Sequence, residues 1–325
     1  MRRSLKAALA GLTLTLLIPA LLTFGRATPA KAGAALSVLW QRQGAARGAT
    51  ALPASVSFHE SEGRGLLVRA WVNGAGPFTL AIDTGAGATL LSQRAASEAR
   101  VEVEAGGGGI RIGGLSGASV GGARKAYVRT LALGSRENTL PARGLFVVAP
   151  GLPEGVDGVL DPSEAFGTLG FVIDIPAGEL SFFDPRAQPL RTSDAPREGA
   201  VVPWLTEGGT RRPFVMLAEG RRALLDTGSS FGLAVDDAAA RALGILETEG
   251  RRRGSRDLAG GEVHARRVRA ATVSVGALVL RGVPTDLLVR AEKGAPVILG
   301  RDALRPFRIM FDPVNRLIML DPREG

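Results

Sequence analysis

The feature that most constrains the fold of this chain is an internal repeat. An apolar run that ends in Asp-Thr-Gly occurs twice, as LAIDTGAGATLLS around Asp83 and as ALLDTGSSFGLAV around Asp226, 143 residues later. The similarity continues downstream, where Gly134 and Gly276 stand 142 residues apart. One unit of about 130 residues has therefore been used twice. We expect two similar lobes packed about a pseudo-twofold axis.

Each copy of the repeat has the pattern of an all-β domain. Short runs rich in Val and Leu, such as GLLVRAWV and RLIMLD, alternate with Gly, Pro or Asn. Helix is scarce, with two short candidates at 92–100 and 236–244, and each begins with a residue that can cap a helix N-terminus. The pattern predicts an all-β fold of two β-barrel lobes with a short helix or two per lobe.

The two aspartates are unusual because each ends an apolar strand. A carboxylate in such a place is costly unless the fold supplies hydrogen bonds or a partner. If the two copies face each other, Asp83 and Asp226 lie side by side, and two like charges at that separation share one proton. One carboxylate is then a general base for water and the other a general acid toward a substrate carbonyl. This chemistry hydrolyses a peptide bond without a covalent intermediate.

The two Asp-Thr-Gly segments resemble the active-site loops of aspartic proteases. DTGA begins at Asp83 and DTGS at Asp226, and VILGRDAL at 297–304 is similar to the corresponding segment of retroviral proteases. The resemblance covers nearly all of 55–321 and implies a bacterial-type protein with two retropepsin-like lobes in one chain. It also implies a polypeptide substrate, no cofactor, and a monomer that needs no second copy.

The same resemblance assigns roles to residues next to the aspartates. Thr84 and Thr227 would bond across the pseudo-dyad and lock the two loops together. Gly85 and Gly228 would shape the turns, with Ser229 as further support of the second loop.

The resemblance also implies flaps over an extended peptide. They would form from the glycine-rich stretches 106–122 and 250–261. Tyr127 aligns with Arg269 in the strand that leaves the flap, so we interpret it as structural rather than as a flap tyrosine. The candidate flap residues are Gly113, Gly114, Gly260 and Gly261.

One position departs from the family pattern. Where the second copy has Gly300, the first copy has Asp161, followed by Pro162. An acid there would crowd the rear of the active-site loop. A neighbouring Arg could neutralise it, Pro162 could turn it outward, or it could mark a lobe that no longer supports catalysis.

The N-terminus has the pattern of an export signal. A positive MRRSLK precedes an uncharged apolar stretch at 7–24, and Ala30-Lys31-Ala32 offers a cleavage site. We expect a signal peptide at 1–32, or an uncleaved anchor as the alternative and the only attachment to a membrane. The location would be periplasmic, cell-surface or secreted. The remaining expected boundaries are a flexible connector at 33–54, lobes at 55–185 and 199–325, and an exposed linker at 186–198.

Composition disfavours other functions. The 40 Lys and Arg residues exceed the 31 Asp and Glu but are scattered, and with 3 Trp and 1 Tyr they do not have the pattern of a nucleic-acid binder. The absence of Cys and the presence of only 2 His disfavour a metal site. Ser229 and Ser230 have no positioned base, and His264 and the Arg251–Arg253 run have the pattern of solvated loop residues.

Two hypotheses follow for the function. The first is an exported aspartic endopeptidase in which Asp83 and Asp226 activate water. The alternative is a catalytically inactive peptide-binding module that retains the fold, with Asp161 as its best support.

Overall fold

A computed structural model describes residues 51–105, 110–116, 119–245, 250–256, 261–289 and 295–323. The predicted signal peptide and most of the connector lie outside these residues. Within the described part, no helix is long and apolar enough to cross a membrane. Both lobes belong to one compact unit, Leu52–Gly325.

The first lobe is built on one large sheet. Its main path follows the order β10-β9-β3-β4-β12-β5-β11-β8-β6, with β2 paired to β3 and β7 paired to β8. The strands are β2 (His59–Ser61), β3 (Gly65–Val72), β4 (Ala75–Ile82), β5 (Thr89–Ser92), β6 (Glu102–Val103), β7 (Ile110–Gly113), β8 (Ser119–Tyr127), β9 (Leu131–Leu133), β10 (Thr139–Leu140), β11 (Phe146–Ala149) and β12 (Gly158–Leu160).

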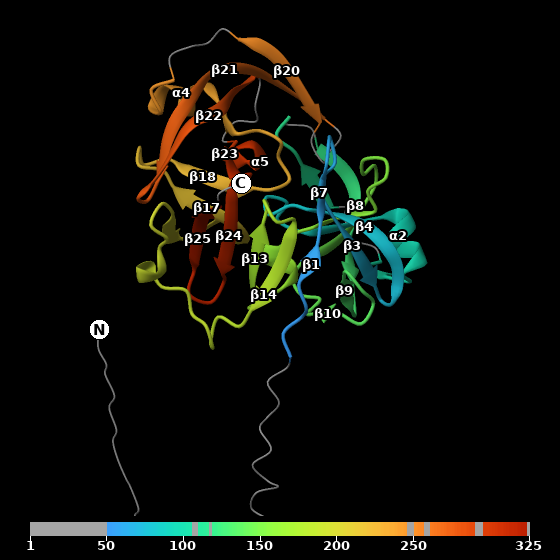
Figure 1. Ribbon diagram of the computed structural model, residues 1–325. Coiled ribbons are helices and arrows are strands. Elements are labelled where there is room, and N and C mark those ends of the chain that lie inside the picture. Colours follow the sequence, from blue (N-terminus) through green and yellow to red (C-terminus); the bar gives the residue numbers. More distant parts are fainter. Residues whose placement is uncertain are drawn as a thin grey trace, which may run out of the picture. The chain divides into compact units, whose positions relative to one another are not determined.

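The second lobe repeats this arrangement in a sheet of order β16-β17-β18-β23-β19-β22-β21-β20. Figure 1 shows its long strands β21 and β22 curving over the lobe. The strands are β16 (Leu205–Glu207), β17 (Thr210–Met216), β18 (Arg222–Asp226), β19 (Leu233–Val235), β20 (Arg251–Arg256), β21 (Glu262–Val275), β22 (Leu278–Val289) and β23 (Val297–Gly300).

In each lobe a late strand threads between two earlier ones. β12 runs parallel to β4 and antiparallel to β5, just as β23 runs parallel to β18 and antiparallel to β19. Gly158, the first residue of β12, has no room for a side chain, because a Cβ there would lie 2.5 Å from the Leu90 carbonyl oxygen. The threading brings the strand that precedes Asp161 beside the strand that precedes Asp83.

A third sheet joins the lobes, with the order β1-β14-β13-β24-β25-β15. Its central pair, β13 and β24, is antiparallel, and Val172 pairs with Met310 while Phe171 pairs with Phe311 and Ile173 with Ile309. The strands are β1 (Val56–Ser57), β13 (Gly170–Asp174), β14 (Glu179–Phe183), β15 (Ala200–Pro203), β24 (Phe307–Asp312) and β25 (Leu317–Pro322). The two copies therefore meet at the centre of this sheet, as a pseudo-twofold axis requires.

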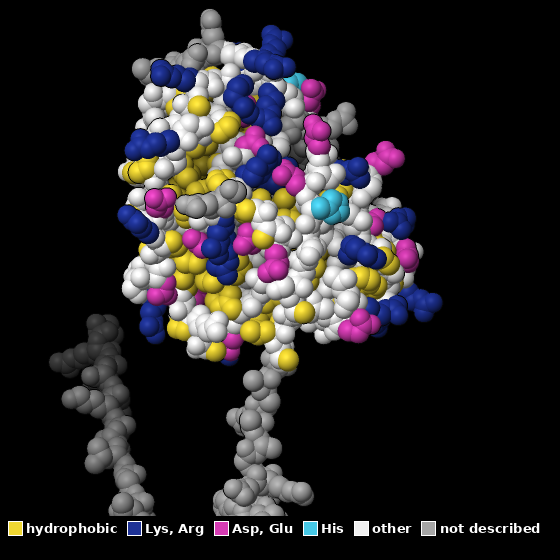
Figure 2. All heavy atoms as spheres, viewed as in Figure 1, with side chains coloured by type: hydrophobic (Ala, Val, Ile, Leu, Met, Phe, Trp, Pro, Cys, Tyr) yellow, Lys and Arg dark blue, Asp and Glu magenta, His cyan; other side chains and the backbone are white. Residues whose placement is uncertain are grey.

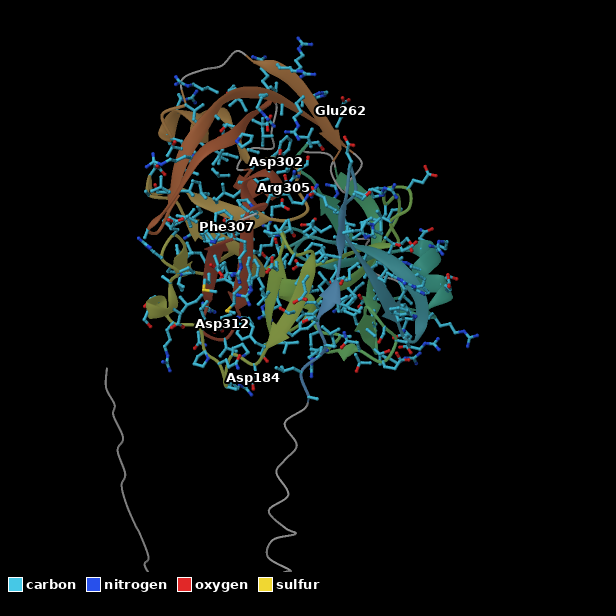
Figure 3. All side chains as sticks on the ribbon, in the orientation of Figure 1. Asp184, Glu262, Asp302, Arg305, Phe307 and Asp312 are labelled. Atoms are coloured by element: carbon cyan, nitrogen blue, oxygen red, sulfur yellow. The ribbon has the colours of Figure 1, made fainter. Side chains whose placement is uncertain are left out.

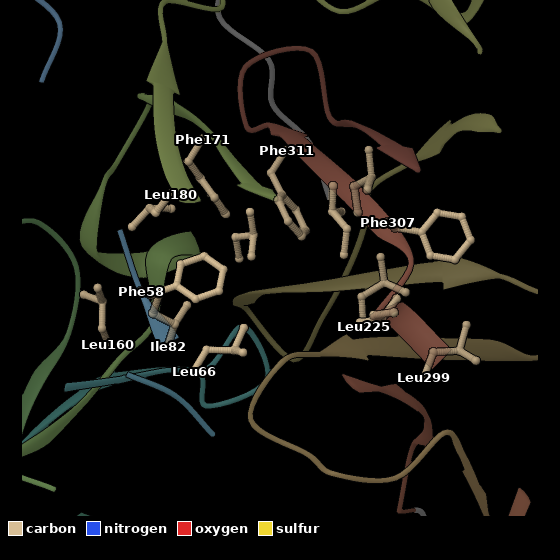
Figure 4. Packing of buried hydrophobic residues seen from close by; sticks show 14 of the residues in the cluster. Phe58, Leu66, Ile82, Leu160, Phe171, Leu180, Leu225, Leu299, Phe307 and Phe311 are labelled. Carbon is tan, nitrogen blue, oxygen red and sulfur yellow. The ribbon is translucent and has the colours of Figure 1, made fainter. Parts of the chain in front are cut away.

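One hydrophobic cluster extends through both lobes. Phe171 and Phe311 stack across the central pair with ring centroids 4.6 Å apart, and Trp204 packs edge-on against both. Figure 4 shows Phe171 and Phe311 next to each other in this cluster, with Leu160 of the first lobe and Leu299 of the second on either side. Because the core is shared, the relative placement of the two lobes is fixed by packing.

The described helices are short. Ser92 accepts a hydrogen bond from the Ala95 N–H at the start of α2 (Gln93–Glu98), and Asp236 accepts one from the Ala239 N–H at the start of α4 (Asp237–Ala242). Both predicted helices and their caps are confirmed, as is the all-β fold of two lobes. Two further helices, α3 (Pro162–Ala165) and α5 (Arg301–Leu304), follow the threading strands β12 and β23. A 3-10 turn, η1 (Thr192–Asp194), lies in the linker.

The segment between the lobes, 186–198, is not exposed along its whole length. Most of it is exposed, but Leu190 is buried and its N–H donates to Oδ2 of Asp312 at 2.9 Å. The other oxygen of Asp312 accepts from the N–H groups of Val314 and Asn315, which closes the β24–β25 turn. The repeat pattern could not reveal this long-range contact.

Candidate active site

The two Asp-Thr-Gly loops meet where β4 and β18 end. Asp83 directly follows β4, and its N–H donates to the Leu160 carbonyl of the threading strand at 2.9 Å. Asp226 is the last residue of β18 and pairs in parallel register with Gly300. The strand pairing thus brings an aspartate to the same point of each lobe.

The threonines bind the two loops together reciprocally. Thr84 Oγ1 donates to the Leu225 carbonyl at 2.6 Å, and Thr227 Oγ1 donates to the Ile82 carbonyl at 3.1 Å. Each hydroxyl also accepts from the opposite threonine's N–H, at 3.2 Å from Thr84 N and 3.1 Å from Thr227 N. Both side chains are fully buried, so all four bonds are shielded from water.

Each glycine of the loops lies against the opposite carboxylate. A Cβ at Gly85 would be 2.6 Å from Cγ of Asp226, and one at Gly228 would be 2.2 Å from Cγ of Asp83. The Gly85 N–H donates to Asp83 Oδ1 at 2.8 Å, and the Ser229 N–H donates to Asp226 Oδ1 at 3.0 Å. The five residues named beside the aspartates in the sequence therefore surround the carboxyl pair.

The two carboxyls are electrostatically unequal. Burial raises the pKa of Asp83 well above its ordinary value, and repulsion from Asp226 and Asp161 raises it further. Burial also raises the pKa of Asp226, but the Ser229 N–H, a hydrogen bond from Asp83 and the charge of Arg301 oppose that rise. The pKa of Asp83 is therefore raised more strongly, and the surroundings of Asp226 give more support to its ionised form.

Such a pair can perform acid-base chemistry on water. Asp226 can accept a proton from a water molecule held between the carboxyls, while Asp83 can donate one to a developing oxyanion. Neither step needs a nucleophilic side chain or a cofactor. The described residues include no cluster of three or more His, Cys, Asp or Glu side chains that could hold a metal ion.

Asp161 is built into the first loop. Its side chain is fully buried, and its two oxygens accept the N–H of Gly87 at 2.8 Å and the N–H of Ser163 at 2.9 Å. Its own N–H donates to Thr89 Oγ1 at 3.2 Å. The side chain thus supports the rear of the loop and does not turn outward.

No basic side chain pairs with Asp161 among the described residues. Burial, with repulsion from Glu164, raises its pKa to about 7, although hydrogen bonds from Ser163 and Gly87 oppose the rise. Of the three alternatives for this acid, neutralisation by a neighbouring Arg has no ion pair to support it in this part of the chain, and the raised pKa favours the protonated form at acidic pH.

The second loop is supported differently, by Arg301. Its guanidinium NH1 donates to the carbonyls of Thr227 and Gly228, both at 2.8 Å, and its Nε lies 3.4 Å from Oε1 of Glu60 in β2. The Arg301 side chain is only 4% exposed. The sequence pattern did not single out this residue, although an Arg directly after the apolar VILG was a usable signal.

The flap candidates lie on two β-hairpins, β7–β8 and β20–β21. Gly113 ends β7 and Gly114 follows it, while Gly261 immediately precedes β21. Gly260 lies outside the described residues. Leu115, in the turn after Gly114, packs against an apolar cluster of the second lobe that includes Phe231. The first hairpin therefore reaches across to the opposite lobe.

Three other residues considered in the sequence form contacts of their own. Tyr127 ends β8, is 49% exposed, and has Lys125 Nζ 5.7 Å from its ring centroid. His264 has an exposed side chain, 3.9 Å from Oε1 of Glu262. Arg253 differs from the solvated residue we expected: its side chain is 30% exposed and forms an ion pair with the buried Asp286.

Comparison with known proteins agrees with the geometry. A family model described as aspartyl protease matches residues 68–161 and 219–303. The two matched regions contain one Asp-Thr-Gly loop each and together span more than half of the chain. No curated protein matches the chain.

Proposed function

The chain belongs to the aspartyl protease family, and from this premise we propose that it is an exported aspartic endopeptidase. It would hydrolyse peptide bonds in an extended polypeptide through the carboxyls of Asp83 and Asp226. Both loops come from one chain, so the site is complete in a monomer.

The observation that carries this proposal is the reciprocal threonine lock. Four buried hydrogen bonds between Thr84, Thr227 and the strands before them hold the loops in contact. A pair of carboxyls would repel each other and separate unless the backbone fixed them. The lock supplies that constraint before substrate binds, as preorganised catalysis requires.

The unequal surroundings assign the roles. Asp226, ionised and stabilised by the Ser229 N–H, is the base that takes a proton from water. Asp83, which holds the shared proton, donates it to the carbonyl oxygen of the substrate. The resulting tetrahedral intermediate collapses when the amine leaves with a proton from the pair, and no covalent enzyme intermediate forms.

The alternative, a peptide-binding module without turnover, depended on Asp161. Its two accepted hydrogen bonds fit it into the loop that carries Asp83 without loss of the threonine lock. We therefore favour the enzyme.

The test is cleavage of casein by the purified protein from pH 3 to 7, with and without pepstatin. Asp83→Asn and Asp226→Asn should each abolish cleavage, because neither carboxyl alone can both accept and donate a proton. Thr210→Ala, at the start of β17, where the hydroxyl donates to the Glu207 carbonyl, serves as a control and should cleave like the wild type. A folded wild type that cleaves nothing at any of these pH values would favour the binding module.

Export is part of the proposal and has a separate test. The charged start, apolar stretch and Ala30-Lys31-Ala32 site support it. N-terminal sequencing of the protein recovered outside the cytoplasm should begin near Gly33. Recovery only with cytoplasmic proteins would overturn export without affecting the proposed activity.

A further inference from the structure

The β20–β21 hairpin and strand β22 gather positive charge on one face. Arg251 lies directly opposite Arg267 in the register, and Arg267 lies opposite Asp286. Because strand residues alternate between faces, Arg253 shares the face of Arg251, and Arg252 points to the other face. In Figure 2 the Lys and Arg side chains gather over this hairpin at the top of the view.

Asp286, the acid of this group, is fully buried and binds two arginines. Arg267 binds Asp286 with two hydrogen bonds of 2.9 Å, from Nε to Oδ1 and from NH2 to Oδ2. Arg253 adds a third contact to Oδ2 at 3.3 Å. The paired fork of Arg267 already satisfies the carboxylate, so Arg253 has positive charge in excess.

Arg253 extends from the hairpin to the loop that carries Asp226. Its NH2 donates to the Ser230 carbonyl at 3.3 Å, and its guanidinium carbon lies 5.2 Å from the ring centroid of Phe231. The Arg253 side chain is 30% exposed, so part of it remains accessible beside this loop. Arg253 therefore contacts the loop that follows Asp226, at a residue four positions beyond the aspartate.

The acids around Arg253 do not balance the charge. Asp302 of α5 lies 3.9 Å from Arg253, but it also pairs with Arg305 at 3.4 Å. Arg305 in turn shares Glu60 with Arg301. Four guanidinium groups thus face three carboxylates, and Arg251 adds charge without an ion-pair partner in the described part of the chain. Figure 3 shows Asp302 and Arg305 below the hairpin, with Glu262 at its end.

The first lobe has no such cluster at the same place. In the register, Val147 occupies the position of Asp286 and Lys125 that of Arg267. Val147 belongs to an apolar cluster with Leu90 and Val159. The excess positive charge therefore belongs to one side of the pseudo-dyad only.

We propose that Arg253, supported by the Arg267–Asp286 pair, forms a specificity subsite that selects an acidic side chain in the substrate on the second-lobe side of the cleaved bond. The inference rests on the proposed endopeptidase function. A Glu or Asp carboxylate at this point would bind the exposed edge of the Arg253 guanidinium beside Ser230. The first-lobe side would accept apolar residues instead.

The test uses a casein peptide that the protein cleaves, with Glu and Gln versions at each position across the cleaved bond. We expect one position at which the Glu peptide has a kcat/KM about ten-fold higher than the Gln peptide. Arg253→Met should bring that ratio near one, and Arg253→Lys should retain part of the preference. Arg252→Met, one residue away on the opposite face, is the matched control and should keep the ratio.

The design separates the two proposals. Melting curves check that Arg253→Met folds, which we expect because Arg267 still pairs with Asp286. If no peptide is cleaved, the endopeptidase fails, and fluorescence anisotropy of labelled Glu and Gln peptides then tests the subsite by binding. An equal response to Glu and Gln at every position, or a Glu preference that persists in Arg253→Met, would overturn the subsite.

Discussion

The two active-site loops have the same Asp-Thr-Gly sequence but are supported from behind by opposite charges. A buried carboxyl, Asp161, supports the loop of Asp83, and a buried guanidinium, Arg301, supports the loop of Asp226. A negative neighbour favours the protonated form of a carboxyl, and a positive neighbour favours the ionised form. The difference teaches that a duplicated fold can keep a symmetric pair of carboxyls and still place each in a different electrostatic environment.

The comparison extends to the residues that the two halves share. The contacts at the centre of the pseudo-twofold axis are symmetric, namely the threonine lock and the central β13–β24 register. The side chains behind the two loops have diverged. A residue on the axis must fit its counterpart in the other lobe, whereas Asp161 and Arg301 each support the backbone of one loop.

The largest expected effect comes from removing the support of the second loop. Arg301→Met should destabilise the protein by about 3 to 5 kcal/mol, since it leaves the buried Thr227 carbonyl and the part-buried Gly228 carbonyl without their donor. Chemical denaturation measures the loss. Arg305→Met in the same helix removes an arginine that is 56% exposed, and it should change stability by less than about 1 kcal/mol. Equal effects of the two variants would show that burial of Arg301 does not matter.

A second prediction concerns pH and the first loop. The folded protein holds the Asp161 proton up to about pH 7, whereas the unfolded chain releases it near the ordinary value of 3.8. The unfolded state therefore binds fewer protons between these values, and Asp161 makes stability fall as pH rises from about 4 to 7. At about 1.4 kcal/mol for each pH unit, the fall is on the order of 4 kcal/mol.

Asp161→Asn isolates this contribution. Relative to the wild type, the variant should become more stable as pH rises from 4 to 8, because the amide has no proton to release. Denaturation at each pH gives the difference, and Asp174→Asn, in a hairpin of the same lobe, is the control. A constant difference between the wild type and Asp161→Asn across this range would contradict the raised pKa.

A third prediction concerns Gly300, the position of the second lobe that is equivalent to Asp161. Gly300→Ala should destabilise the protein by about 2 kcal/mol, since its Cβ would lie 2.4 Å from the Phe231 carbonyl oxygen and 2.9 Å from that of Ser229. Thermal unfolding provides the measurement. Gly121→Ala, where a Cβ meets nothing within 4 Å, should unfold at nearly the wild-type temperature. A Gly300→Ala variant that unfolds at the wild-type temperature would contradict this close approach of the two carbonyls.

The smallest expected effect concerns a device that both lobes retain. Ser92→Ala and Asp236→Ala should each cost about 1 kcal/mol, because each removes the side-chain acceptor at a helix N-terminus. Ser97→Ala, inside the first of these helices, is the control. The denaturation midpoint should shift by similar amounts in the two variants. Very different shifts would show that the two lobes have also diverged at these helix caps.

The sequence alone predicts the repeat, the all-β lobes, both capped helices and the carboxyl pair. These features depend on local patterns: apolar runs, cap residues and one short tripeptide in two copies. A pattern of this kind survives in the sequence because each residue acts through its neighbours along the chain. The family resemblance added the threonine lock and the flaps.

Only the tertiary structure decided what lies behind each loop. Asp161 and Arg301 act on backbone groups more than 70 residues away, Gly87 and Thr227, so nothing beside them in the sequence reveals the contact. Arg253 was hidden in a run of three arginines, of which it alone contacts Asp286 and the Ser230 carbonyl. Charge in a sequence is a count, whereas a pKa or a subsite depends on burial and distance, and these exist only once the chain has folded.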